Sequence, residues 1–282
     1  MISPIVVLTD FGIKDPFVGI MKGVISSIKS SIPIIDLTHE IPPGDIKLGA
    51  VTLWQSHTYF PPGTIFLTVI DPGVGTQRRP LVIKSKGYTF IGPDNGIFSY
   101  VLDENFRAWE LQNPKLALIN PSTTFHGRDV FAPAAAYAAS GIPGGNFGSA
   151  VSDINRIPYP KLLNSSSGVV NGEIIHLDSF GNALTSIGEL SQTNRSKYEF
   201  HPWVIDENRQ WADHNRVIDL KSSYLEVSDN RKLTWQPTFG EIPQDKIAFI
   251  VGSSRLIEIA ANRQSAAKKL KMNPGDPVTL VL

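Results

Sequence analysis

The sequence of 282 residues contains no cysteine. Disulfide bonds, zinc sites built on thiolates and cysteine nucleophiles are therefore excluded. Neither sign of charge is in excess, because 26 lysines and arginines balance 26 aspartates and glutamates. Proteins that bind nucleic acid through its phosphates usually carry a basic excess, so we expect no nucleic-acid partner.

Long apolar runs are also missing. No stretch reaches the ~18–20 apolar residues that a membrane-spanning helix needs. Residues 1–10 include a short apolar run without a basic segment before it, and so do not resemble a signal peptide. We therefore expect a cytoplasmic protein that has no membrane partner.

Several common catalytic motifs are absent. The sequence has no GxxxxGK[ST] phosphate loop and no GxSxG nucleophile elbow. Its six histidines lack the spacing of metal ligands, and we predict neither a metal site nor a cofactor. The stretch "VIDPGVGTQRRP" (69–80) begins like a dinucleotide-binding loop, but Arg78 replaces the third glycine and Pro80 stands where a helix should open. Its Asp-Pro-Gly favours a tight turn, which leaves the two arginines unexplained.

Strand and helix patterns alternate in the first half of the chain. This alternation is typical of a mainly parallel sheet that helices cover on both faces, so the sequence predicts an N-terminal α/β sandwich domain. Strands are expected at 5–8, 34–37 and 64–70 and on both sides of a turn at Lys86-Gly87, and helices at 17–28, from 46 to before Pro61, and at 127–141.

The composition changes near residue 156, where serine, proline and glycine become frequent. We place an N-terminal domain at 1–158, a linker at 159–167 and a C-terminal domain at 168–282. The second domain is expected to be smaller and to form an antiparallel, barrel-like β structure. Only the stretch 256–270 in it has a clear helical pattern.

Polar residues follow several of the predicted strands. Asp10, Asp36 and Asp71 each close an apolar run, and Asp94 with Asn95 closes another. Aspartate and asparagine often serve only to cap helices and close turns. Several of them at one edge favour a ligand site, because open α/β sheets bind ligands beyond the carboxyl ends of their strands.

A second polar loop holds His126, immediately before a predicted helix. A single histidine in such a loop is more often a structural hydrogen-bonding group than a catalyst. The motifs around these polar residues nevertheless occur together and in a fixed order. With them the sequence resembles the S-adenosyl-L-methionine (SAM) hydroxide adenosyltransferases, which are related to enzymes that fluorinate or chlorinate SAM. The motifs are "TDFG" (9–12), "DPGVGTQRR" (71–79), "GPDNG" (92–96), "FHGRDVFAP" (125–133), "DSFGN" (178–182) and "EIAANRQSAA" (258–267).

The resemblance implies a reaction, a fold and an assembly. The reaction is SAM plus water giving adenosine and L-methionine, with SAM as the substrate and no further cofactor. The fold is an N-terminal α/β domain followed by a smaller β-rich domain. The assembly is a homotrimer, in which the substrate lies where the N-terminal domain of one subunit meets the C-terminal domain of a neighbour.

The family's catalytic Asp, Arg and His fall on Asp71, Arg78 and His126. The sulfonium of SAM leaves C5′ as a neutral thioether, so no general acid is needed and one water must be oriented and activated. The resemblance implies that Asp71 fixes Arg78, and that Arg78 and His126 position this water. Two closely spaced glycines would then bend the chain so that Asp71 and Arg78 face it.

Further residues match substrate contacts of the family. Relatives read Ser-x-Gly-Tyr-Leu where this sequence has "SSRLI" (253–257), so the fit around the amino-acid tail of SAM departs from the family pattern. The implied contacts are Asp10 to the ribose hydroxyls, Asn95 within the substrate site, Asp178 to the methionine ammonium, Asn182 to the adenine edge, Phe239 stacked on adenine, Ser253 to the methionine carboxylate, and Asn262 beside the adenine.

Two other functions fit part of these observations. A SAM halogenase would use a halide in place of water, but the halogenating relatives lack the intact Asp, Arg and His set. A non-catalytic module that binds SAM or adenosine would keep the substrate contacts without turnover. A SAM methyltransferase is disfavoured, because its glycine-rich loop after the first strand is missing here.

Overall fold

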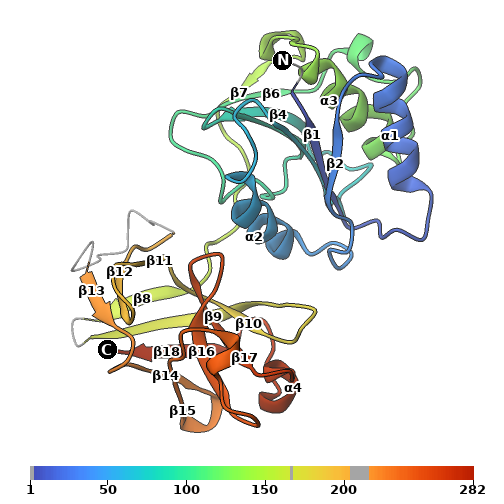
Figure 1. Cartoon of the computed structure of the whole chain (residues 1–282). Coiled ribbons are helices and arrows are strands. Elements are labelled where there is room, and N and C mark those ends of the chain that lie inside the picture. Colours follow the sequence, from blue (N-terminus) through green and yellow to red (C-terminus); the bar gives the residue numbers. More distant parts are fainter. Residues whose placement is uncertain (1–2, 166–167, 204–215) are drawn as a thin grey trace. The chain divides into compact units, whose positions relative to one another are not determined.

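The computed structural model describes residues 3–165, 168–203 and 216–282 (Figure 1). The chain forms two compact units, residues 1–157 and 158–282. The stretch predicted to be a linker, 159–167, contains a strand of the second unit. No helix within the described ranges is both long and apolar enough to cross a membrane.

The first unit is built on a seven-stranded sheet in the order β2-β1-β3-β5-β4-β6-β7. The pairs β1–β2, β1–β3 and β3–β5 are parallel, as predicted, whereas β4–β5, β4–β6 and β6–β7 are antiparallel. The change of direction comes from the β4–β5 hairpin, whose turn residues Lys86 and Gly87 both have positive φ. The strands are β1 (Ile5–Thr9), β2 (Ile34–Thr38), β3 (Ile65–Val69), β4 (Pro80–Ser85), β5 (Tyr88–Pro93), β6 (Arg107–Glu110) and β7 (Ala150–Val151).

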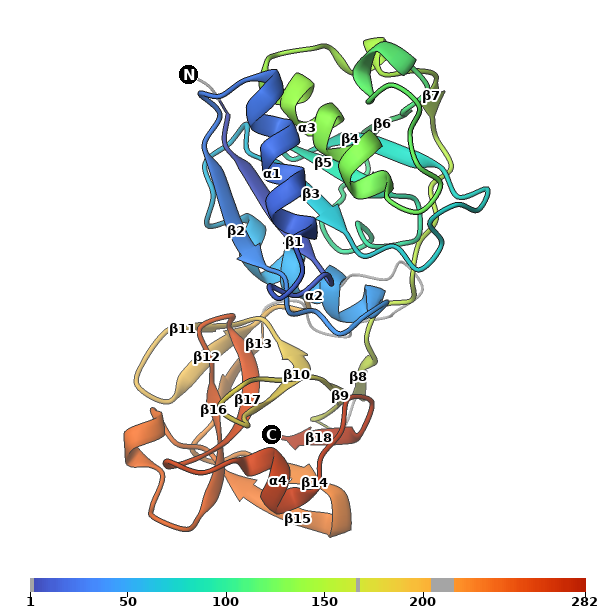
Figure 2. The ribbon, with the colours of Figure 1, turned by 90° about the vertical axis from the view of Figure 1, so that its right-hand side faces the viewer.

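Helices cover this sheet on both faces (Figure 2). The helices α1 (Phe17–Ile28) and α3 (Ala132–Ala139) lie side by side on one face, and α2 (Ile46–His57) lies on the other. In α3 the alanines at 134–136 are fully buried, and their small side chains let the helix pack closely on the sheet. Strands β1 and β3 are buried along their whole length. The polar residues Asp10 and Asp71, which follow these two parallel strands, lie at one edge of the sheet.

The second unit is mostly antiparallel β structure, as predicted. Its larger sheet has the order β15-β14-β18-β9-β10-β17-β16, with β8 paired to β9. A bridge between Trp235, just after β15, and Phe249 in β16 joins the two ends of this order, so the sheet is almost closed into a barrel. The strands are β8 (Leu162–Ser165), β9 (Val169–Leu177), β10 (Ala183–Gly188), β14 (Tyr224–Val227), β15 (Arg231–Thr234), β16 (Ile247–Val251), β17 (Leu256–Ala261) and β18 (Pro277–Val281), and a small separate sheet has β11 (Leu190–Gln192), β12 (Lys197–Phe200) and β13 (Arg216–Asp219).

The prediction of a helix at 256–270 is wrong for most of this stretch. Residues Leu256–Ala261 form strand β17, and only α4 (Ala266–Leu270) is helical. The strand is covered on both faces, so Leu256, Ile259 and Ala260 are all buried. Their i, i+3, i+4 spacing therefore imitates the apolar face of a helix, an ambiguity that short apolar runs share.

Candidate functional site

The structure brings Asp71, Arg78 and His126 together in the first unit. The guanidinium of Arg78 donates from Nε to both oxygens of Asp71, at 3.0 and 3.1 Å, and from Nη2 to Oδ2 at 2.5 Å. The same Nη2 lies 2.7 Å from Nδ1 of His126. The three side chains thus form one hydrogen-bonded network, with the cation in the middle.

This ion pair is buried. The side chain of Arg78 is 8% exposed and that of Asp71 is 5% exposed. One face of the guanidinium lies over the ring of Phe131, with 5.2 Å between Cζ and the ring centroid. The remaining nitrogen, Nη1 of Arg78, is buried and has no hydrogen-bond partner among the described residues. A buried donor without a partner costs free energy, and both N–H groups of Nη1 remain available for a hydrogen bond.

The contact to Arg78 fixes the state of His126. Guanidinium has no acceptor, so Nδ1 of His126 must be the acceptor and cannot carry a proton. Burial lowers the pKa of His126, and the positive charge of Arg78 lowers it further. The imidazole is therefore neutral near pH 7, and its other nitrogen, Nε2, carries the hydrogen.

Two loops hold the network. The first runs from Asp71 to Arg78, and Gly75 within it has φ +79°. A Cβ atom on Gly75 would lie 2.7 Å from the carbonyl oxygen of Thr123, which belongs to the loop before His126. Glycine is thus needed at 75 both for the backbone angle and for the close approach of the two loops. The second loop leads into a π-helical turn, Gly127–Phe131, a rare element that often occurs at functional sites.

Arg79 has its own carboxylate partner. Its Nε and Nη2 donate to Oδ2 of Asp94, at 2.9 and 2.6 Å, and the backbone N–H of Asp94 donates to the carbonyl of Arg79 at 2.9 Å. Asp94 is 2% exposed on its side chain and also accepts from the backbone N–H of Asn155. These bonds fix the chain beside Arg78 to the end of β5. The second arginine of the pair therefore has a supporting role that the sequence pattern did not reveal.

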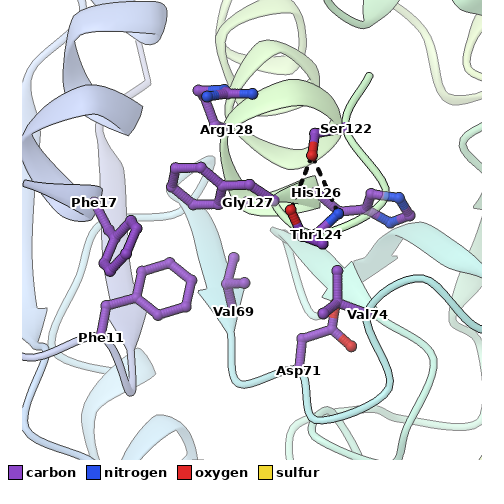
Figure 3. Close-up of a pocket in the computed structure, with 11 residues that line it drawn as sticks. Phe11, Phe17, Val69, Asp71, Val74, Ser122, Thr124, His126, Gly127 and Arg128 are labelled. Carbon is purple, nitrogen blue, oxygen red and sulfur yellow. Dashed lines mark hydrogen bonds between the residues drawn. The ribbon is translucent and has the colours of Figure 1, made fainter. Parts of the chain in front are cut away.

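A pocket of about 450 Å³ opens beside the network (Figure 3). Asp71 and His126 line one side, and the rings of Phe11 and Phe17 line the other. The ring of Phe125 also lines the pocket. The three rings contact one another edge to face, with centroids 5.3–5.9 Å apart. The pocket therefore offers an apolar wall opposite a polar network. The sequence did not indicate these rings as site residues, because phenylalanine close to predicted strands and helices is expected to belong to the hydrophobic core.

Asp10 and Asn95 lie at the same edge of the sheet. Asp10 accepts from the backbone N–H of Gly44 at 2.8 Å, and burial together with the nearby charge of Asp71 raises its pKa. Asn95 donates to the carbonyl of Ile70 at 2.8 Å and accepts from the backbone N–H of Ile97. The bonds of Asn95 thus fix the residue directly before Asp71.

The other five predicted site residues gather in the second unit. Asp178, Asn182, Phe239, Ser253 and Asn262 line a single cavity of about 1330 Å³. Phe239 is 46% exposed, so one face of its ring is available to a ligand. The sequence motifs, which lie up to 84 positions apart, therefore meet around one space.

Two of these residues bond to each other. Asp178 accepts from the backbone and side-chain amides of Asn182, both at 2.8 Å, and from the backbone N–H of Phe180. These bonds hold the tight β9–β10 connection, in which Gly181 has φ +83°. Asp178 therefore shapes the cavity wall as well as lining it.

Glu258 on β17 also lines the cavity and was not predicted as a site residue. Its carboxyl group packs against the Cα of Gly252, where any side chain would overlap it. Burial and the neighbouring Asp178 raise the pKa of Glu258 to about 7. The cavity thus contains two close carboxyl groups, one of which titrates near neutral pH.

The turn at 252–255 shows how the sequence departs from the family pattern. Arg255 stands at the position where relatives have glycine, and it has φ +63°, a left-handed angle that glycine adopts without strain. Its guanidinium forms a 2.7 Å ion pair with Glu189. The backbone shape of the turn is therefore the one that glycine favours, although the side chain differs.

These features are those of an enzyme with an α/β fold, in which a carboxylate–guanidinium–imidazole network lies beside an apolar pocket. The chain belongs to the SAM hydroxide adenosyltransferase family. The sequence model of the N-terminal domain of that family matches residues 5–148, and the model of its C-terminal domain matches residues 172–279. The predicted resemblance is thereby confirmed.

Relatives extend over nearly the whole chain. The (R)-S-adenosyl-L-methionine hydrolase of Thermus thermophilus is 34% identical over 287 residues, which cover 99% of this chain and 99% of that protein. A fluorinase of Actinoplanes sp. is 31% identical over 214 residues, which cover 66% of this chain and 72% of that protein. A crystal structure of an uncharacterized conserved protein from Thermotoga maritima matches with a TM-score of 0.83 and 31% identity, over 99% of this chain and 100% of that one.

The close approach of the two loops predicts the effect of Gly75→Ala. Alanine at 75 would have to adopt a left-handed angle at a cost of roughly 1 kcal/mol and would also press on Thr123. We expect the contact between Arg78 and His126 to open and kcat to fall at least ~10-fold, which is about 1.4 kcal/mol in the barrier. Gly141→Ala is the matched control, since Gly141 also has a positive φ of +89° but an added Cβ there would meet no atom within 4 Å. Equal kcat values for the two variants would contradict this account.

The raised pKa of Glu258 predicts a pH-dependent stability. Between its unfolded pKa of 4.5 and its folded pKa of about 7, the folded protein holds the extra proton, so stability falls as pH rises through this range. Glu258→Gln should remove the penalty and stabilise the protein by about 1–3 kcal/mol at pH 8, with little difference at pH 5. Urea unfolding at both pH values measures this, and the exposed Glu241→Gln serves as the control. A Glu258→Gln variant that is less stable than the parent at pH 8 would refute the interpretation.

Proposed function

We propose that this protein hydrolyses S-adenosyl-L-methionine to adenosine and L-methionine by attack of water at C5′. Membership of the family and the hydrolase names of full-length relatives support the reaction. The observation that carries the mechanism is the buried network of Asp71, Arg78 and His126, in which one guanidinium nitrogen, Nη1, has no partner among the described residues. Halogenation is the less favoured reaction, because the complete Asp, Arg and His set is the one that the family uses for water.

In this proposal Arg78 positions the attacking water. Its Nη1–H donates to the water oxygen, and the fixed positive charge stabilises hydroxide character as the O–C5′ bond forms. The C5′–S bond breaks at the same time, and its electron pair stays on sulfur, which leaves as the neutral thioether of methionine. Arg78 keeps its proton, and Nδ1 of neutral His126 already accepts from Arg78 while Nε2 carries a hydrogen, so the proton that water releases passes to solvent.

The surroundings suit this chemistry. The rings of Phe11, Phe17 and Phe125 give the pocket an apolar wall, and we expect this wall to limit the access of bulk water to bound substrate, which would strengthen the interactions of the network. Asp10 is proposed to accept the two ribose hydroxyls at the same sheet edge, and Asn95 to support Asp71 there. The second-unit cavity is proposed to take adenine beside Asn182, Phe239 and Asn262 and the amino-acid tail beside Asp178 and Ser253.

We further propose that the protein is a cytoplasmic homotrimer. The support is the family resemblance and the division of labour between the units: the network lies in the first unit, and the adenine and methionine contacts lie in the second. A site that needs the first unit of one subunit and the second unit of a neighbour would make assembly a condition of activity.

Arg78→Ala and His126→Ala test the mechanism. We expect kcat to fall by about 10²–10³, because a preorganised charge-stabilising group is removed, while the Kd for SAM changes little. Product analysis by chromatography should give adenosine and methionine in equal amounts from the parent, without added halide. The exposed Arg231→Ala is a control for loss of one guanidinium.

Two results would contradict the proposal. Free adenine as the main product would mean attack at C1′ rather than C5′. Tight SAM binding by the parent protein with no turnover would instead indicate a binding module.

Subunit complementation tests the assembly. Arg78→Ala disables the first-unit network, and Phe239→Ala removes adenine stacking, which is worth ~1–3 kcal/mol. If each site combines two subunits, co-expressed trimers of the two variants contain some sites with both parts intact. At SAM concentrations well below KM we expect about a quarter of the parent activity, the statistical share for random mixing. No gain over the separate variants would mean that each site is built from one chain.

A further inference from the structure

A second cavity in the first unit lies at the opposite end of the sheet from the network. It has a volume of about 480 Å³ and adjoins Ile65 and Thr89, at the amino ends of β3 and β5. Asp71 follows the carboxyl end of β3, so a whole strand separates the two places. The volume falls within the ~300–1,000 Å³ that is usual for small-molecule sites.

The rim of this cavity is basic. Lys84, Lys86 and Arg107 all line it and are all exposed. Lys84 in β4 pairs directly with Arg107 in β6, so the two cations stand side by side on one face of an antiparallel pair. Like charges in that arrangement repel and destabilise a sheet.

No carboxylate neutralises this pair within the described residues. None of the three basic side chains has a salt bridge there, although Asp103 also lines the cavity. The carboxylate of Asp103 instead accepts from the backbone N–H of Asn105 at 3.1 Å. Arg107 is placed over the ring of Trp109, with 6.0 Å from Cζ to the ring centroid.

The nearby end of α3 does not supply the missing negative charge either. A helix C-terminus can attract cations through its free carbonyl groups. Here the carbonyls of residues 136–138 already accept from the backbone N–H groups of residues 140–142. The basic rim therefore forms no salt bridge with a carboxylate among the residues that the structure describes, which favours an external anion.

Below the rim the wall is partly apolar. Ala138, Ile142 and the ring of Tyr88 line the cavity and are each partly exposed. A ligand that fits would place an anionic group between the basic side chains and a small apolar body against this wall. The hydroxyl of Tyr88 is engaged with the carbonyl of Phe60 at 3.1 Å, so the ring is held in place.

We propose that this cavity binds a small organic oxyanion, with a phosphate or carboxylate group between Lys84, Lys86 and Arg107 and an apolar body of about one ring. The site is separate from the SAM reaction proposed above and does not depend on it. It accounts for a repulsive cross-strand pair that would otherwise only destabilise the sheet.

The test uses phenyl phosphate as the probe, with benzoate to compare the two anionic groups and inorganic phosphate to measure the role of the apolar body. Binding is followed by calorimetry in a buffer free of other oxyanions, and by amide chemical shifts to locate the site. We expect phenyl phosphate to bind with a Kd of about 1 mM or tighter, and more tightly than inorganic phosphate. Shifts should centre on β4 and β6.

The decisive variant is Lys84→Gln/Arg107→Gln. It should weaken phenyl phosphate binding at least ~10-fold while leaving thermal stability equal or higher, since it relieves the cross-strand repulsion. Lys29→Gln/Lys115→Gln removes the same charge elsewhere in the unit and should leave binding unchanged. The proposal is overturned if the parent does not bind the probe, if both double variants lose affinity equally, or if neither loses it.

Discussion

The structure of the candidate site depends on one buried cation, the guanidinium of Arg78. A charge that is 92% buried must be paired, or it would cost several kcal/mol in desolvation. Asp71 supplies the pairing from the end of β3, and His126 supplies an acceptor from the loop before α3. Removal of Asp71 would leave a buried charge without compensation, and removal of His126 would leave a buried N–H of Nη2 without an acceptor. The two loops that carry Asp71 and His126 therefore have to meet at the buried guanidinium of Arg78.

The surrounding fold supports this arrangement in steps. The fully buried strands β1 and β3 place Asp10 and Asp71 on neighbouring strand ends. Arg79 anchors the chain beside Arg78 to Asp94, and Gly75 allows the two loops to touch. The result is a donor that is fixed before any substrate arrives, which is the condition under which electrostatic stabilisation is most effective.

Much of this was visible in the sequence, for physical reasons. The strand and helix periods of the first unit are strong, and the predicted helix at 17–28 agrees with α1 to the residue. The grouping of Asp71, Arg78 and His126 came from motif resemblance, since no local pattern reveals a contact across 48 positions. The strand β17 was predicted as a helix because both of its faces are buried. Glu258 and the Phe11–Phe17–Phe125 wall were missed, because burial of an acid and exposure of an aromatic ring appear only after folding.

The central claim is that the network directs a water molecule to C5′. Hydrolysis of SAM in ¹⁸O-labelled water, followed by mass spectrometry of both products, tests it most directly. Attack of water at C5′ should place one labelled oxygen in the 5′-hydroxyl of adenosine and none in methionine. Unlabelled adenosine, or label in an amino-acid product such as homoserine, would contradict it, because the oxygen would then have come from another source or entered at another carbon.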